Sequence, residues 1–142
     1  LSYPPCRRTI KPVFELYREV MFVAAFHERY KVAVASERGV GLTFSNWQDV
    51  WYLGPDIRKP DFPLENHQII ALIAARAFLL LAGESADNDR SWAFIDATLP
   101  IYRLLGAEKH IGWFNQREGH RFSPRAQEVA HKFLGAHLSP KQ

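Results

Sequence analysis

Several residue types and patterns that would define a protein class are scarce or missing in this chain of 142 residues. Cysteine occurs once, as Cys6, so no disulfide can form within the chain. No apolar run approaches the roughly 18 residues that are needed to cross a bilayer, and no apolar segment typical of a secretion signal follows the first residues. We therefore expect a globular protein that depends on a packed core, and we expect no membrane partner.

Charge of one sign is not concentrated in any long segment. The formal net charge is only +3, and basic and acidic residues are interleaved beyond a short basic stretch at Arg7, Arg8 and Lys11. Proteins that bind nucleic acids carry clustered basic surfaces, so no nucleic-acid partner is expected. The histidines have no spacing typical of a metal site, and no metal or other cofactor is predicted.

What the chain does contain is material for a core. Hydrophobic residues make up 47% of the sequence and aromatic residues 13%, which is typical of a folded domain. Residues 1–12 are rich in proline and basic side chains and predict an extended arm. Residues 13–142 are expected to form a single domain.

Short apolar segments alternate with helical patterns along that domain. Residues 31–36, 77–82 and 110–115 predict strands, and the second of them reads AFLLLA. Helices are expected over residues 13–30, 66–74, 91–105 and 124–137, with Pro100 either kinking the third or starting another helix. This alternation predicts the α/β class, with about three parallel strands and helices on the faces of the sheet.

A long irregular segment, residues 43–63, separates the first predicted strand from the next helix. It contains Trp47, Trp51 and Tyr52 among glycines and prolines. These aromatic side chains could pack under the loop, which is the favoured interpretation. The alternative is a contact surface, as in a non-catalytic binding protein.

Two polar loops follow the second and third predicted strands. The first contains Glu84, Asp87 and Asp89, and the second contains His120 after a glycine. Because the carboxyl ends of parallel strands meet at one edge of a sheet, an acid and a histidine there can form the orienting half of a catalytic triad. Asp87 or Asp89 could instead cap the helix that is predicted to start near Ser91. Because a single aspartate is enough for a cap, a functional role is favoured for Asp87.

The nucleophile of such a triad is not evident. The pattern G-x-S-x-G does not occur, and no serine lies on a glycine-flanked turn between a strand and a helix. Ser36 ends a predicted strand, but Glu37 and Arg38 follow it rather than a helix. We expect the serines to be ordinary polar or capping residues.

Three segments together carry a resemblance to a known family. Residues 20–46 begin VMFVAAFHERYKVAVAS, which is similar to a helix ending in AAFDER and a strand AVVAS in bacterial α/β-hydrolases related to glucuronoyl and acetyl-xylan esterases. Residues 61–92 resemble the following helix, strand and acid loop, and residues 100–120 resemble the segment that leads into the catalytic histidine. The resemblance extends over about residues 20–138.

This resemblance implies the C-terminal part of a serine α/β-hydrolase that acts on small or carbohydrate-linked carboxylic esters. It implies His120 as the base and Asp87 as the acid, with Asp89 and Glu84 as alternatives. The serine of the family would fall near Phe14, where the resemblance has already ended.

The chain is therefore predicted to be catalytically incomplete. It would be a fragment, a truncated or frame-disrupted product, or a non-catalytic binding protein derived from a hydrolase. The sheet edge next to the missing nucleophile strand would be exposed, so self-association through it is also expected.

Overall fold

The computed structural model describes residues 13–14, 19–45 and 54–138 of the chain. In chain order the strands and helices are β1 (Val13–Phe14), α1 (Glu19–Phe26), β2 (Val32–Ser36), α3 (Asn66–Ala71), β3 (Ala77–Ala82), α4 (Trp92–Leu104), β4 (Ile111–Asn115) and α5 (Pro124–Leu138). Short 3₁₀ helices lie at Pro55–Arg58, Asp89–Ser91 and Glu108–His110. The predicted basic arm and the aromatic residues Trp47, Trp51 and Tyr52 lie outside the described residues.

The sheet is parallel, with the strand order β1-β2-β3-β4. Every residue of β2 and β3 is buried, which explains why these strands are apolar throughout rather than alternating. Ser36 pairs with Leu81, and Ala82 pairs with Asn115, so the carboxyl ends of the three longer strands lie level with one another. The predicted α/β class with three parallel strands is confirmed, and the two-residue β1 adds a fourth.

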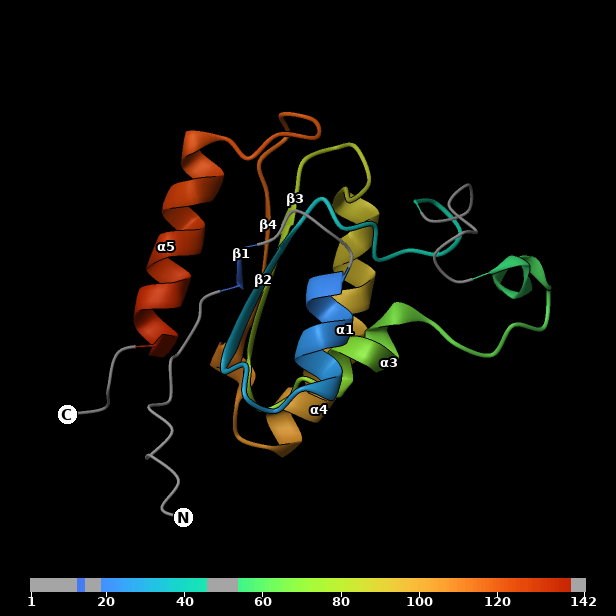
Figure 1. Ribbon diagram of the computed structural model, residues 1–142, viewed down its shortest axis with the longest axis horizontal. Coiled ribbons are helices and arrows are strands. Elements are labelled where there is room, and N and C mark those ends of the chain that lie inside the picture. Colours follow the sequence, from blue (N-terminus) through green and yellow to red (C-terminus); the bar gives the residue numbers. More distant parts are fainter. Residues whose placement is uncertain (1–12, 15–18, 46–53, 139–142) are drawn as a thin grey trace, which may run out of the picture.

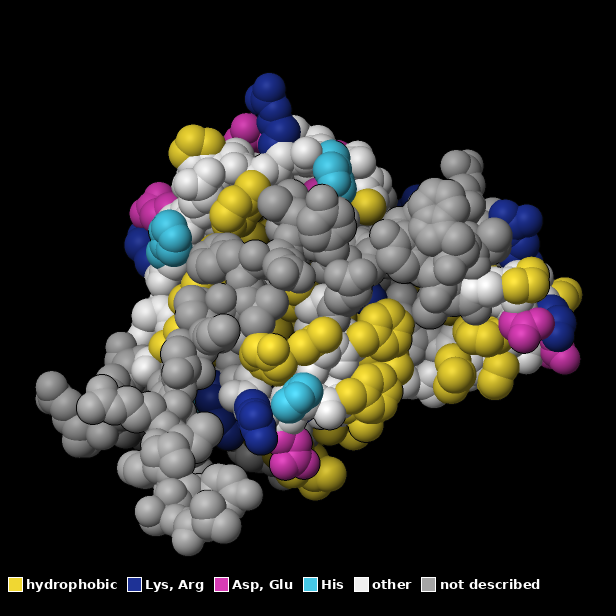
Figure 2. Space-filling model, viewed as in Figure 1, with side chains coloured by type: hydrophobic (Ala, Val, Ile, Leu, Met, Phe, Trp, Pro, Cys, Tyr) yellow, Lys and Arg dark blue, Asp and Glu magenta, His cyan; other side chains and the backbone are white. Residues whose placement is uncertain are grey.

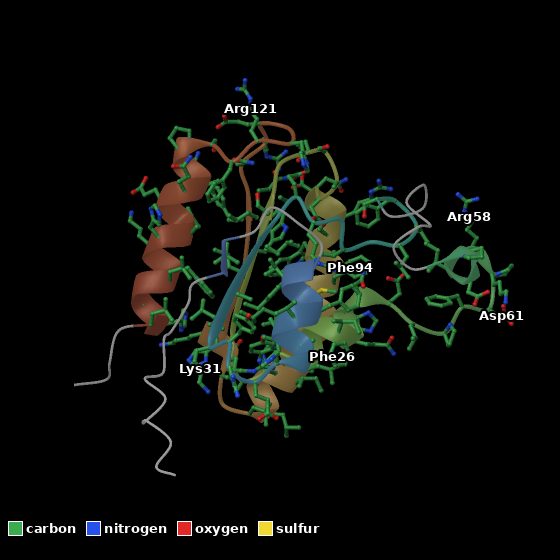
Figure 3. All side chains as sticks on the ribbon, in the orientation of Figure 1. Phe26, Lys31, Arg58, Asp61, Phe94 and Arg121 are labelled. Carbon is green, nitrogen blue, oxygen red and sulfur yellow. The ribbon has the colours of Figure 1, made fainter. Side chains whose placement is uncertain are left out.

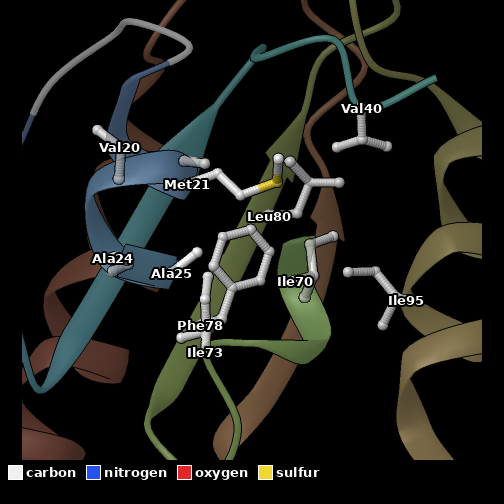
Figure 4. Packing of buried hydrophobic residues seen from close by; sticks show 12 residues of the cluster. Val20, Met21, Ala24, Ala25, Val40, Ile70, Ile73, Phe78, Leu80 and Ile95 are labelled. Atoms are coloured by element: carbon white, nitrogen blue, oxygen red, sulfur yellow. The ribbon is translucent and has the colours of Figure 1, made fainter. Parts of the chain in front are cut away.

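Helices cover both faces of this sheet (Figure 1). Helices α1, α3 and α4 lie on one side, and α5 lies on the other. Side chains alternate along β3 between the two cores, because successive residues of a strand point to opposite faces. Phe78 and Leu80 pack with α1, α3 and α4 (Figure 4), whereas Leu79 and Leu81 pack against α5.

The element boundaries correct two predictions. Residues 13–30 do not form one helix, because Val13 and Phe14 pair with β2 and α1 begins only at Glu19. Sheet pairing therefore overrides the helical pattern at this end. Pro100 lies inside α4, which continues to Leu104, so no second helix starts there.

Helix α1 has an unusual surface. Every residue after Glu19 is apolar, and Phe26 at its end is 70% exposed. Figure 2 shows hydrophobic side chains at the surface on this side of the molecule, and Phe26 is labelled in Figure 3. Helices that are apolar on all sides are usually buried. The self-association predicted earlier concerns the exposed sheet edge instead, and it stays a prediction.

Within the described parts of the chain, no helix combines the length and the apolar character that a membrane span requires.

Candidate functional site

Three loops meet at the edge of the sheet where β2, β3 and β4 end. Residues 37–45 follow β2, residues 83–88 follow β3, and residues 116–123 follow β4. This edge is where open parallel sheets bind ligands. Each loop brings one candidate side chain: Glu37, Asp87 and His120.

Glu37 is the first residue after β2, and its carboxylate is held inside the protein. Its main-chain N–H donates to the carbonyl of Leu81 at 2.8 Å, and its φ of 48° lies in the left-handed region that glutamate rarely adopts. The side chain is 1% exposed, and Oε2 accepts a hydrogen bond of 2.6 Å from the main chain of Ala86. A buried charged group in an uncommon backbone conformation is typical of a functional site.

Burial raises the pKa of the Glu37 carboxyl above its ordinary value. The hydrogen bonds from the main chain of Ala86 and Asp87 act in the opposite direction, as does the nearby imidazole of His120, but burial has the larger effect. The carboxylate is thus held in a site of low polarity, where an interaction with a cation is stronger than in water.

His120 is the imidazole next to this carboxylate. Its Nδ1 lies 3.7 Å from Oε2 of Glu37, and its side chain is 55% exposed. That distance is longer than a hydrogen bond, but catalytic hydrogen bonds often shorten only when substrate binds. With Nδ1 directed toward the carboxylate, Nε2 is left as the nitrogen that can exchange protons with a substrate or nucleophile.

Asp87, the predicted acid, is engaged elsewhere. It is fully buried, and its two oxygens accept hydrogen bonds from the main chain of Gly39 at 2.6 Å and of Val40 at 2.9 Å. The hydroxyl of Ser91 donates to it at 2.9 Å. Asp87 therefore ties the loop after β2 to the start of α4. The structure shows no hydrogen bond or ion pair between Asp87 and His120, both of which it describes, so the geometry favours Glu37 as the acid.

The two alternative acids lie in a surface network instead. The amide of Asn115 donates to Glu84 and, at 2.9 Å, to Asp89, while Arg117 donates to Asp89 at 2.8 Å. The hydrogen bond from Asn115 and, to a smaller extent, the one from Arg117 lower the pKa of Asp89. This network joins the loop after β3 to the loop after β4, and the structure shows no hydrogen bond or ion pair between its members, all of them described, and His120.

Sequence reasoning missed Glu37, although a signal was present. A charged residue directly after a fully apolar strand stands at the carboxyl edge of the sheet, and Glu37 is followed two residues later by a glycine-rich turn. The predicted acids Glu84, Asp87 and Asp89 all belong to the loop after the second predicted strand.

The position expected for the nucleophile is also defined. Phe14 is the last residue of β1 and pairs with Val34 of β2, so a phenylalanine stands where the resemblance would require the serine. Among the described residues, no cluster of three or more histidine, cysteine or acidic side chains could bind a metal ion.

Comparisons with known proteins place the fold. No family model and no curated protein matches the chain. A carbohydrate esterase family 15 glucuronoyl esterase from Caldicellulosiruptor kristjansonii matches with a TM-score of 0.71 at 21% identity, over 88% of this chain and 41% of that one. A glucuronoyl esterase from Solibacter usitatus matches with a TM-score of 0.73 at 14% identity, over 86% of this chain and 40% of that one.

The chain has part of an α/β-hydrolase fold. A methylesterase is also similar, with a TM-score of 0.60 at 14% identity over 85% of this chain and 27% of that one. The chain spans about two fifths of the length of the glucuronoyl esterases it matches. At these identities the likeness shows the fold, and activity has to be argued from the site.

Proposed function

We propose that this chain carries the acid and the base of a serine-esterase-like triad for the hydrolysis of carboxylic esters. The observation that carries the proposal is the pairing of a buried Glu37 carboxylate with Nδ1 of His120, 3.7 Å away, at the carboxyl edge of the sheet. Acid and histidine also follow each other in the chain order of α/β-hydrolases. The structural similarity to esterases supports the same reaction class.

In this mechanism, His120 moves the proton and Glu37 holds the imidazole in place. Nε2 of His120 takes the proton of a serine hydroxyl while the serine oxygen attacks the ester carbonyl. The same nitrogen then gives that proton to the leaving alcohol. Water, activated by the same nitrogen, hydrolyses the acyl-serine intermediate. Glu37 stays ionised throughout, accepts from Nδ1 and stabilises the imidazolium.

The serine would have to come from outside the described part of this chain. Phe14 has no hydroxyl, and the described serines do not lie on a turn between a strand and a helix with flanking glycines. Removing triad members lowers the rate by several orders of magnitude. In this proposal the described part of the chain is therefore catalytically incomplete, as in a pseudoenzyme, and its substrates when completed are small or carbohydrate-linked esters.

Hydrolysis of p-nitrophenyl acetate by the purified chain, beside the His120→Ala variant, tests the incomplete triad. We expect equal rates for both proteins, because a base without a nucleophile adds little. Turnover that disappears in His120→Ala would reveal a nucleophile within this chain and refute the proposal that it is incomplete.

A complementation experiment tests the roles of the pair. The chain would be refolded together with the portion of one of the similar glucuronoyl esterases that this chain does not cover, about three fifths of that protein. We expect ester hydrolysis that is lost in His120→Ala and strongly reduced in Glu37→Gln, but retained in the matched control Glu84→Gln. Activity that survives His120→Ala would refute the assignment.

The alternative prediction, a non-catalytic binding protein that uses Trp47, Trp51 and Tyr52, concerns residues outside the described part of the chain. No described feature favours it over the esterase proposal.

A further inference from the structure

The loop that carries His120 is closed by one buried amide side chain. Gln116 follows β4 directly, is 8% exposed, and donates its main-chain N–H to the carbonyl of Ala82 at 2.9 Å. Its Nε2 donates to the carbonyl of Arg121, and its Oε1 accepts from the main chain of Ser123 at 3.1 Å. Gln116 thus links the start of the loop to its end, on either side of His120.

The same amide and the carboxylate that faces His120 both lie close to Gly83. The main chain of Gly119 donates to the carbonyl of Gly83, which follows β3. A Cβ atom on Gly83 would overlap with the carbonyl oxygen of Gly119, and would lie 2.7 Å from Oε1 of Glu37 and 3.0 Å from Nε2 of Gln116. The His120 loop, the Glu37 carboxylate and the Gln116 amide therefore converge on Gly83, which has no side chain and directly follows β3.

The imidazole itself is more than half exposed. With its side chain 55% exposed, His120 takes its position from the backbone of its loop, whereas Glu37 is almost fully buried. The distance between Nδ1 and Oε2 consequently depends on whatever sets the shape of residues 117–122. A catalytic group is held in its productive geometry by neighbouring side chains whose own rotamers are fixed by packing and hydrogen bonds.

We propose that Gln116 is a positioning residue for His120, holding its loop closed so that Nδ1 faces Glu37. The proposal rests on the function proposed above, since it assigns Gln116 to the same pair. The hydrogen bonds of the Gln116 side chain go to Arg121 and Ser123 and not to His120, so Gln116 would act through the loop.

The tautomer of His120 tests this without requiring activity. A carboxylate that accepts from Nδ1 favours the Nδ1–H form of a neutral imidazole. Long-range ¹H–¹⁵N spectra of the full chain at about pH 9, where histidine is normally neutral, measure the share of this form, and His120→Ala assigns the signals. We expect Gln116→Met, which keeps the length but removes both hydrogen bonds, to lower the share to that found in Glu37→Gln.

A matched control is Gln127, an exposed residue of α5 that donates to the same loop. The amide of Gln127 donates to the carbonyl of Phe122 at 2.9 Å, so Gln127→Met also removes a hydrogen bond to this loop. We expect that variant to keep the parental tautomer share. An equal fall in both variants would mean general loosening of the loop and would overturn the proposal.

Each further outcome has a defined meaning. An unchanged share in folded Gln116→Met, together with a fall in Glu37→Gln, overturns the role of Gln116 alone, whereas no change in Glu37→Gln overturns the proposed Glu37–His120 pair. In the double variant, no additional fall is expected, because Gln116 acts through that pair. If Gln116→Met does not fold, Gln116→Glu keeps an acceptor for Ser123, loses the donor to Arg121, and carries the same expectation.

Discussion

Replacing Asp87 by alanine should destabilise the protein strongly, although the sequence predicts Asp87 as a catalytic acid. The fully buried carboxylate accepts from Gly39, Val40 and Ser91. Hydrogen bonds to a charged group contribute about 1.5–3 kcal/mol each, and they overlap here because they share one acceptor group. We therefore expect a loss of about 3–5 kcal/mol, a large part of the roughly 5–15 kcal/mol by which domains are stable.

Urea unfolding followed by far-ultraviolet circular dichroism measures this loss. Asp87→Asn keeps the shape of the side chain and one of its two acceptor oxygens, so it should lose less stability than Asp87→Ala. Some loss is still expected, because the new amide donor would face a main-chain N–H. Asp96 is exposed on α4, and Asp96→Ala should change the free energy of unfolding by no more than about 0.5 kcal/mol. A loss under about 1 kcal/mol in Asp87→Ala would refute the structural role and restore Asp87 as a candidate acid.

Three more predictions follow from the same region and from the helices. Burial raises the pKa of Glu37 above 4.5, so the folded state binds this proton more tightly than the unfolded state does. Relative to Glu37→Gln, the parent should therefore become less stable in urea as the pH rises from 4.5 to neutrality. A difference in stability that does not change with pH would contradict this. Gly83→Ala should cost about 1–3 kcal/mol through overlap with Gly119, whereas Gly135→Ala in α5 meets nothing within 4 Å and should gain up to about 1 kcal/mol. If the chain self-associates, sedimentation should show Phe26→Ser, which removes an exposed apolar ring, shifted toward monomer; a monomeric parent would exclude the association.

The order of strands and helices was predictable because each signal is local. The uninterrupted apolar runs of β2 and β3 follow from burial of both their faces, and the serine and proline before α5 mark its start. Residues 13–14 were misassigned for the opposite reason: a two-residue strand has no periodicity of its own and exists only through pairing with β2.

The sequence alone was sufficient to determine the α/β class, the edge of the sheet at which polar loops gather, and His120 as the candidate base. It did not determine which carboxylate faces that histidine, since Glu37, Glu84, Asp87 and Asp89 all follow strands of the same sheet. The tertiary structure decided this, because direction and burial depend on contacts between loops that are distant in sequence. Asp87 turns inward to amides 47 and 48 residues away, and Glu37 is thereby left beside His120.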